Sequence, residues 1–249
     1  MAGPRAAFSV IRTDMQQAAL TMSAILEIAA FRHGQALAGD DRSAEINGLE
    51  EALNDGLTAS WAGNLFPSYG GQLRSDVTPA LTPPTGLITP SNATVSYRVL
   101  RHSYFSAIIG NEAPTIGVTS NRMMGFIAEN FLPHQIVDTT QPEISWPGLK
   151  FDKATIVMSQ YAPSQDGVND PDLGNYLSTG EVLAWLNFGP QGDDAYIRLY
   201  VAQSSKFAFG FTGFKGARED NQVSGQILFG GNLTVKALRL SRILHNFTA

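Results

Sequence analysis

The residues best suited to chemistry lie together in one short acidic loop. Four of them carry side-chain oxygens: Asp166, Asn169, Asp170 and Asp172. Ca²⁺ is a hard cation that prefers carboxylate and amide oxygens of this kind. The ligand order of an EF-hand and its distant glutamate are absent, and Asp and Asn are also common in ordinary turns. The loop is therefore a candidate calcium site, with a structural turn as the alternative.

Aromatic side chains indicate a second kind of site. Trp146, Tyr161 and Tyr176 could stack on the rings of a glycan. Aromatic residues also contribute strongly to cores and interfaces, so packing is the alternative role for each of them. A glycosidase would need two carboxyl groups, for instance those of Glu143 and Glu181, at a separation that the sequence does not define.

Motifs of other catalytic sites are missing from the sequence. It contains no cysteine, which excludes thiolate metal sites, cysteine nucleophiles and disulfides. The four histidines form no HExxH pattern, and we expect all of them at the surface or at an edge: His33, His102, His134 and His245. There is no G-x-S-x-G elbow or phosphate-binding loop. We therefore expect no enzyme, and no cofactor apart from the possible calcium ion.

Charge excludes some classes of partner. The net charge is -5 and the pI about 5.3, which argues against a nucleic-acid binder. The one basic cluster is predicted to be a solvated edge: Lys236, Arg239, Arg242 and His245. Only 16% of residues are charged, so a partner subunit could bind this surface without desolvating many charges. The apolar stretch 18–31 is too short for a membrane span and contains Glu27, so no membrane insertion is expected.

The N-terminal part of the chain is predicted to be helical, over residues 13–37 and again over 43–57. Met15, Met22 and Ala29 recur every seven residues, and the apolar stripe of the first helix is wider than a two-stranded coiled coil requires. The stripe could pack on the rest of this chain. Alternatively, it binds a partner through Met15, Met22, Ile25, Leu26, Ile28 and Phe31.

The rest of the chain is predicted to be an extended neck followed by strands. The neck is rich in Pro and Gly, and proline is excluded from central strands because it lacks a backbone donor. The alternation of Phe207, Phe209 and Phe211 is the clearest strand signal. Strands are predicted over 94–100, 103–109, 115–119, 123–128, 135–138, 154–161, 182–188, 195–203, 206–212, 226–229 and 233–240.

These elements predict a mainly β fold, with an antiparallel β-sandwich or jelly-roll-like body and an N-terminal helical segment. Three segments are expected along the chain. Residues 1–62 form a helical attachment or oligomerisation segment, 63–92 an extended neck, and 93–249 the β-sandwich body.

This organisation, with a cysteine-free body rich in Gly, Asn and Thr, resembles the virion structural proteins of bacteriophages, of the fibre, spike, decoration or capsid type. The resemblance implies a homo-oligomer, commonly a trimer, that is anchored to other virion proteins by its N-terminal helices. It also implies synthesis in the host cytoplasm, assembly into the virion, and a free end that faces a host receptor such as a surface glycan. The alternative function is a lectin-like, carbohydrate-binding β-sandwich with possible calcium dependence, and a glycan-acting enzyme ranks third.

Overall fold

The structure contains helices and strands in similar proportions. The computed structural model describes residues 4–34, 46–76, 88–90, 94–131, 149–167, 169–170, 174–175, 178, 180–190, 192–202, 208–213, 215–216 and 223–247. The α-helices in this part of the chain are α1 (Pro4–Phe31), α2 (Leu49–Ala52), α3 (Tyr97–Ser106) and α4 (Asn121–Phe131). Short 3₁₀ turns cover Arg74–Asp76, Gly192–Asp194 and Leu238–Leu240.

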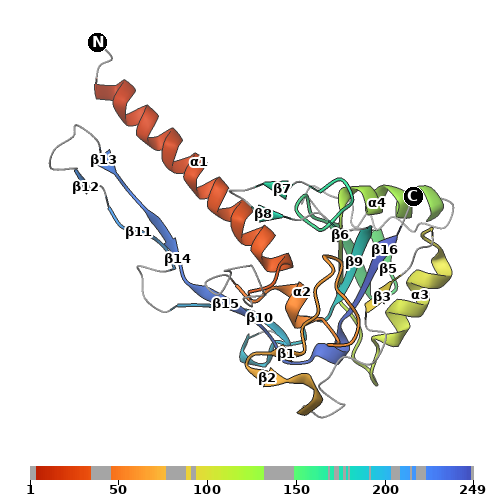
Figure 1. Ribbon diagram of the computed structural model, residues 1–249. Helices are drawn as coiled ribbons and strands as arrows, with labels where there is room; N and C mark the ends of the chain where they lie inside the picture. The colour runs from red at the N-terminus through yellow and green to blue at the C-terminus, as the bar shows by residue number, and fades with distance from the viewer. Residues whose placement is uncertain are drawn as a thin grey trace.

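The largest sheet has six strands in the order β3-β16-β9-β4-β6-β5. In chain order they are β3 (Ile88–Pro90), β4 (Ile116–Thr119), β5 (Leu149–Phe151), β6 (Ala154–Met158), β9 (Glu181–Leu186) and β16 (Arg242–Phe247). The β16–β3 and β4–β6 pairs are parallel and the other three are antiparallel. The sheet is therefore mixed, with α3 and α4 packed against its strands (Figure 1). Several sheets and an N-terminal helix are present, but a mainly β antiparallel sandwich is not confirmed.

The sheet is covered on both faces at strand β9. All six residues of this strand are buried, although successive side chains point to opposite faces. Leu183 and Trp185 belong to the apolar cluster that includes residues of α3 and α4. Val182, Ala184 and Leu186 alternate with them and belong to a second cluster. A strand buried on both faces is apolar almost throughout, in agreement with its sequence Glu-Val-Leu-Ala-Trp-Leu.

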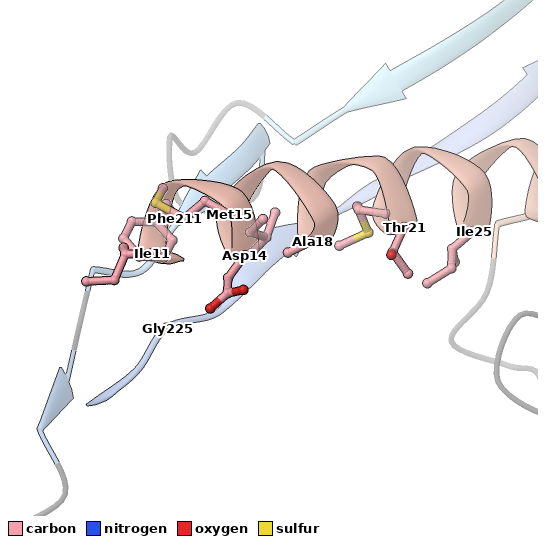
Figure 2. A pocket seen from close by; sticks show the side chains of 10 residues that line it. Ile11, Asp14, Met15, Ala18, Thr21, Ile25, Phe211 and Gly225 are labelled. Atoms are coloured by element: carbon pink, nitrogen blue, oxygen red, sulfur yellow. The ribbon is translucent and has the colours of Figure 1, made fainter. Parts of the chain in front are cut away.

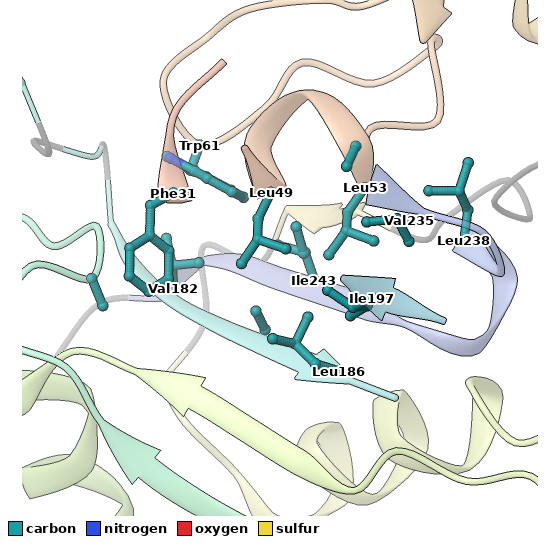
Figure 3. Close-up of a cluster of buried hydrophobic side chains, with 13 residues drawn as sticks. Phe31, Leu49, Leu53, Trp61, Val182, Leu186, Ile197, Val235, Leu238 and Ile243 are labelled. Atoms are coloured by element: carbon teal, nitrogen blue, oxygen red, sulfur yellow. The ribbon is translucent and has the colours of Figure 1, made fainter. Parts of the chain in front are cut away.

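The second cluster joins the N-terminal segment to the sheet. In Figure 3, Phe31, Leu49, Leu53 and Trp61 lie beside the side chains of β9 and β16. Leu53 is fully buried and Trp61 is 3% exposed. The segment predicted as 1–62 and the body predicted as 93–249 therefore share one core.

Helix α3 corrects the prediction of strands over 94–100 and 103–109. Ser96 caps the helix, since its hydroxyl accepts a hydrogen bond from the Val99 backbone N–H. Leu100, Ser103 and Tyr104 are the buried residues of the helix, at the helical spacing of three and four. The Val, Tyr and Phe residues of this segment favour strands, but burial of this one face against the sheet decides the structure.

Helix α4 corrects the prediction of a strand over 123–128. Ser120 precedes the helix and accepts a hydrogen bond from the Met123 backbone N–H, at 3.1 Å. Met123 and Ile127 are four residues apart and both are fully buried. The predicted strand 135–138 lies outside the described residues.

Other boundaries also differ from the predicted ones. Helix α1 begins at Pro4 rather than at residue 13 and ends at Phe31, and proline is favoured in a first helical turn. Helix α2 has only four residues, because Asn54 and Asp55 bond instead to the backbone of the following turn. Strand β16 was not predicted, although it lies inside the sheet. In the neck, β3 pairs at the sheet edge, where Pro90 is tolerated.

A long antiparallel ribbon, which we call the hairpin arm (residues 197–235), extends away from the sheet (Figure 1). Its described pairs are β10 (Ile197–Val201) with β15 (Gly231–Val235), β11 (Ala208–Phe211) with β14 (Ile227–Phe229), and β12 (Lys215–Gly216) with β13 (Val223–Ser224). The register shifts between Ala208 and Gly210, so a bulge interrupts the strand in which Phe207, Phe209 and Phe211 were predicted to share one face. Two smaller ribbons pair β1 (Ser68–Tyr69) with β2 (Gln72–Leu73), and β7 (Asn169–Asp170) with β8 (Gly174–Asn175).

Gly48 is the point of closest approach between α2 and the end of α1. A Cβ atom at Gly48 would lie 2.5 Å from the carbonyl oxygen of Ala29 and 2.7 Å from that of Ala30. We expect Gly48→Ala to destabilise the protein by roughly 1–3 kcal/mol in urea unfolding, because backbone atoms of α1 must move. Gly125→Ala is the matched control: nothing lies within 4 Å of its Cβ position in α4, and Ala favours helix. Equal stability of the two variants would contradict this packing.

Candidate interaction groove between helix α1 and the hairpin arm

The buried residues of helix α1 that join it to the body lie near its C-terminal end, within the described residues. Ile28 is fully buried and Phe31 is 8% exposed. The carboxylate of Glu27 accepts a hydrogen bond from the Ser159 hydroxyl, which follows strand β6. Just beyond the helix, the Gly34 backbone N–H donates to the carboxylate of Glu51 at 3.2 Å. These contacts fix one end of a helix whose 28 residues span about 42 Å.

Toward its N-terminus α1 projects into solvent. Every side chain from residue 11 to residue 20 is exposed, and Leu20 is 72% exposed. Ile11 and Met15, one turn apart, are also among the exposed large apolar residues. Most helices in proteins are stabilised by packing of an apolar face, and this half of α1 has little packing within its own chain.

An apolar groove lies between α1, over residues 11–25, and the hairpin arm (Figure 2). Its volume is about 640 Å³. Seven lining residues come from α1 and three from the arm: Ile11, Asp14, Met15, Ala18, Thr21, Met22, Ile25, Phe211, Gly225 and Ile227. Asp14 is the one charged residue in this lining. The α1 members recur at spacings of three and four, so they share one face of the helix.

The hairpin arm also exposes apolar side chains. Leu199, Tyr200 and Val201 in β10 are each between 40% and 45% exposed. Successive residues of a strand point to opposite faces, so both faces of the ribbon are open at β10. An isolated two-stranded ribbon is at best marginally stable in water, so the arm needs further packing to hold this shape.

The base of the arm is firmly held by the body and the neck. Ile197 and Val235 are buried in the second cluster. The Val235 backbone N–H donates a hydrogen bond of 3.2 Å to the hydroxyl of Tyr69, and burial raises the pKa of that phenol. The guanidinium of Arg74 lies 5.6 Å from the Tyr69 ring centroid and donates to the Phe66 carbonyl; burial lowers its pKa. The described part of the neck thus packs on its own subunit.

An ion pair at the surface extends this base. Arg198 of β10 donates to the carboxylate of Asp193, and its guanidinium also lies 4.5 Å from the ring centroid of Tyr200. The hydrogen bond from Arg198 lowers the pKa of the Asp193 carboxyl. The Lys236 ammonium donates to the Asp193 backbone carbonyl at 2.6 Å. The base of the arm thus has a described ion pair, whereas the lining of the groove is mainly apolar.

The six α1 residues predicted to bind a partner divide between two environments. Met15, Met22 and Ile25 line the groove. Ile28 and Phe31 are buried against this chain's own body, and Leu26 is half-buried outside the groove lining. Self-packing of the apolar stripe thus describes the C-terminal end of α1, whereas docking stays open for the part that lines the groove. Sequence reasoning did not place Phe211 and Ile227 beside α1, since no local pattern relates residues so far apart.

The sequence matches no known protein-family model, and no curated protein is similar to it. The geometry of the groove and of the residues around it is therefore the basis for any assignment of function.

The predicted calcium loop contains one residue whose side chain is described. The carboxylate of Asp166 is exposed and forms an ion pair of 2.9 Å with Arg122. Asn169 and Asp170 belong to β7, but the structure does not describe their side chains. Asp172 lies outside the described residues. Among the residues that the structure describes, no three His, Asp or Glu side chains form a group that could hold a metal ion. Calcium binding stays a prediction.

The predicted glycan contacts are described only at Tyr161, which is half-buried after strand β6, while Trp146 and Tyr176 lie outside the described residues. The aromatic side chain of Trp185 is fully buried in the core. None of the described helices is long and apolar enough to cross a membrane.

The carboxylate of Glu181 is buried but serves a structural purpose. It accepts hydrogen bonds from the hydroxyls of Ser120 and Ser164 and from the Gln165 backbone N–H. The Nε of Arg122 lies 3.8 Å away. These bonds tie the start of β9 to the start of α4 and to the loop after β6, and each hydroxyl is already engaged with the carboxylate.

Two histidines depart from the prediction of surface positions. His33 and His245 are 3% and 5% exposed, whereas His102 is exposed on α3 and His134 lies outside the described residues. The prediction of a solvated basic edge is also wrong in part, because Arg242 is buried while Lys236 and Arg239 are exposed. The errors at Arg242 and His245 arise because strand β16 lies inside the sheet, although its charged residues are typical of an exposed edge.

Proposed function

We propose that this protein is a structural subunit of a homo-oligomeric assembly, in which the groove between α1 and the hairpin arm is a subunit interface. The observation that carries the proposal is the pair of projecting elements with exposed apolar side chains on the same groove. Exposed apolar groups gathered in this way are typical of protein–protein contact surfaces.

Three properties support association of the chain with itself. Its low content of charged residues, 16%, limits the cost of desolvating a large surface. The exposed stretch of α1 from residue 11 to residue 20 and the ribbon of the arm both need packing that their own chain supplies only in part. Finally, soluble oligomers are most often homo-oligomers with closed symmetry. A trimer is the state we favour, because the resemblance to virion structural proteins implies one.

We further propose that the assembly is a virion component of the fibre, spike, decoration or capsid type, made in the host cytoplasm and not an enzyme. The support is the organisation of the sequence, with an N-terminal helix for attachment to other virion proteins and a cysteine-free body. A host surface glycan is the proposed ligand of its outward end. No antiparallel sandwich is required for this role, since the mixed sheet with its helices supplies the rigid body.

Charged substitutions in the groove test the interface. We expect Met15→Asp and Ile25→Asp to weaken self-association by tenfold or more, because burying a carboxylate without a partner is costly. Sedimentation equilibrium of the full chain over a range of concentrations measures the change.

The matched control is Gln17→Asp, which adds the same charge to an exposed position of α1 outside the groove lining. It should leave the association constant within about twofold of the unmodified chain, and all three variants should keep the unmodified circular dichroism spectrum because the sites are exposed. An equal effect of Gln17→Asp, or none from Met15→Asp and Ile25→Asp, would contradict the groove as the interface.

A further inference from the structure

His245 occupies an unusual position in strand β16. It is 5% exposed, and neither ring nitrogen has a hydrogen-bond partner within the described part of the chain. A neutral imidazole normally satisfies at least one of its nitrogens when buried, because an unmade hydrogen bond is costly in the interior. The position therefore calls for a reason beyond packing.

The backbone around His245 is irregular. The register between β16 and β9 shifts between Leu244 and Phe247, and Asn246 has a φ of +68°. A side chain on Gly180 would meet the Asn246 backbone, since its Cβ would lie 2.7 Å from the carbonyl carbon. A bulge thus interrupts the pairing with β9 at His245, so on that side His245 has no regular partner.

On its other side His245 is paired with Pro90 of β3, in parallel register. Strand β3 is three residues long and lies at the edge of the sheet, and in the described part of the chain its one strand neighbour is β16. The opposite neighbour, β9, is held by β4 as well as by β16. Strand β3 is therefore the most weakly attached element next to His245.

Within the described residues, the strands paired with this part of β16 supply no free carboxylate that could balance a proton on His245. Strand β3 contributes no titratable residue, and the one in β9, Glu181, has its carboxylate bonded to Ser120 and Ser164. In β16 itself, Arg242 lies three residues before His245 and opposite Trp185 in the strand register. Helix α3, which packs against β16, carries Arg98, Arg101, His102 and Tyr104, and helix α4, which packs against β9, carries Arg122 and Glu129. On the other face, the N-terminal segment that packs through the second cluster carries Glu27, Arg32, His33, Glu50, Glu51, Asp55, Tyr69 and Arg74. Burial alone lowers the pKa of His245, to about 4.

We propose that His245 is an acid-sensitive latch that holds β3, and with it the end of the neck, against the central sheet. When the imidazole ring is neutral, β3 stays paired with β16 at the edge of the sheet. An imidazolium carries two N–H donors and a charge, neither of which is satisfied there, and opening of β3 would admit water to both. This inference is independent of the proposed assembly role.

The direction of the pH effect follows from linkage. Since the closed form has the lower pKa, the opened form binds the proton more tightly, with an ordinary histidine pKa of about 6.5. Closure is therefore fully favoured above that pH and is lost as the pH falls toward 4. With these two values, the opening equilibrium rises about thirtyfold between pH 7.5 and pH 5.0.

Hydrogen–deuterium exchange of the full chain at these two pH values tests the latch. After correction for the intrinsic exchange rate, the protection factor of the peptide containing Ile88 and Thr89 should be about thirtyfold lower at pH 5.0 than at pH 7.5. The peptide containing β4 should keep its protection. Unchanged protection of β3, or an equal loss in β4, would overturn the proposal, because the second result indicates global unfolding.

Two substitutions separate His245 from the other histidines. His245→Phe should abolish the pH dependence of exchange in β3, whereas His102→Gln, at an exposed position, should retain it. If His245→Phe does not fold, titration of the histidine ring protons by NMR in the unmodified chain decides the matter. A ring that titrates well below pH 6 supports the latch, and titration of all described histidines near pH 6.5 overturns it.

Discussion

A chain that begins at residue 93 will not form a stable domain. It lacks Leu49, Leu53 and Trp61, which are buried in the cluster on one face of β9 and β16. Burial of three such side chains contributes roughly 5–9 kcal/mol, comparable to the whole stability of a typical domain. Circular dichroism and urea unfolding of residues 93–249 should therefore show no cooperative transition.

The matched control is a chain that lacks only residues 1–20. The side chains from residue 11 to residue 20 are exposed, and the anchoring residues Ile28 and Phe31 are retained. We expect its unfolding free energy to stay within about 1 kcal/mol of that of the full chain. If residues 93–249 unfolded as cooperatively as the full chain, the shared core would not be needed, and the segments would be independent domains.

Trp185→Ala should cause the largest loss of stability among single core substitutions, about 3–5 kcal/mol. The indole is fully buried and its Nε1 donates to the Ser103 hydroxyl at 2.9 Å. Its ring centroid lies 5.3 Å from that of Tyr104 and 5.4 Å from that of Phe151. Removal of the indole therefore leaves a cavity and two aromatic rings without their neighbour, and the Ser103 hydroxyl keeps only its bond to the Leu100 carbonyl among those described.

Urea unfolding measures this loss, and Tyr97→Ala is its control. Tyr97 packs near Phe151 but is 52% exposed, so its removal should cost less than about 1 kcal/mol. A loss below 1 kcal/mol for Trp185→Ala would show that the aromatic cluster adapts to the missing ring.

The sequence was informative where one local pattern decides the structure. Strands β9 and β10 and helix α1 were predicted because apolar runs and helical spacing are strong local signals. Helices α3 and α4 were predicted as strands because their Val, Tyr, Phe and Ile residues have β propensity, and only packing against the sheet favours the helix. Strand β16 was missed because Arg242 and His245 make it look like a solvated edge.

The candidate groove was predictable only in part. The heptad spacing of α1 identified Met15, Met22 and Ile25, which line it. The same stripe also included Ile28 and Phe31, which the body buries, since periodicity does not reveal where a helix leaves its own domain. Phe211 and Ile227 meet α1 through the path of the hairpin arm, a tertiary feature that local patterns do not encode.

The molar mass of the full chain in solution tests the central claim most directly. One subunit has a mass of 26.8 kDa. If α1 and the hairpin arm form a subunit interface, multi-angle light scattering at micromolar concentration should give an integer multiple of this mass, with three as the expected number. A mass of 26.8 kDa that persists as the concentration is raised would contradict the account.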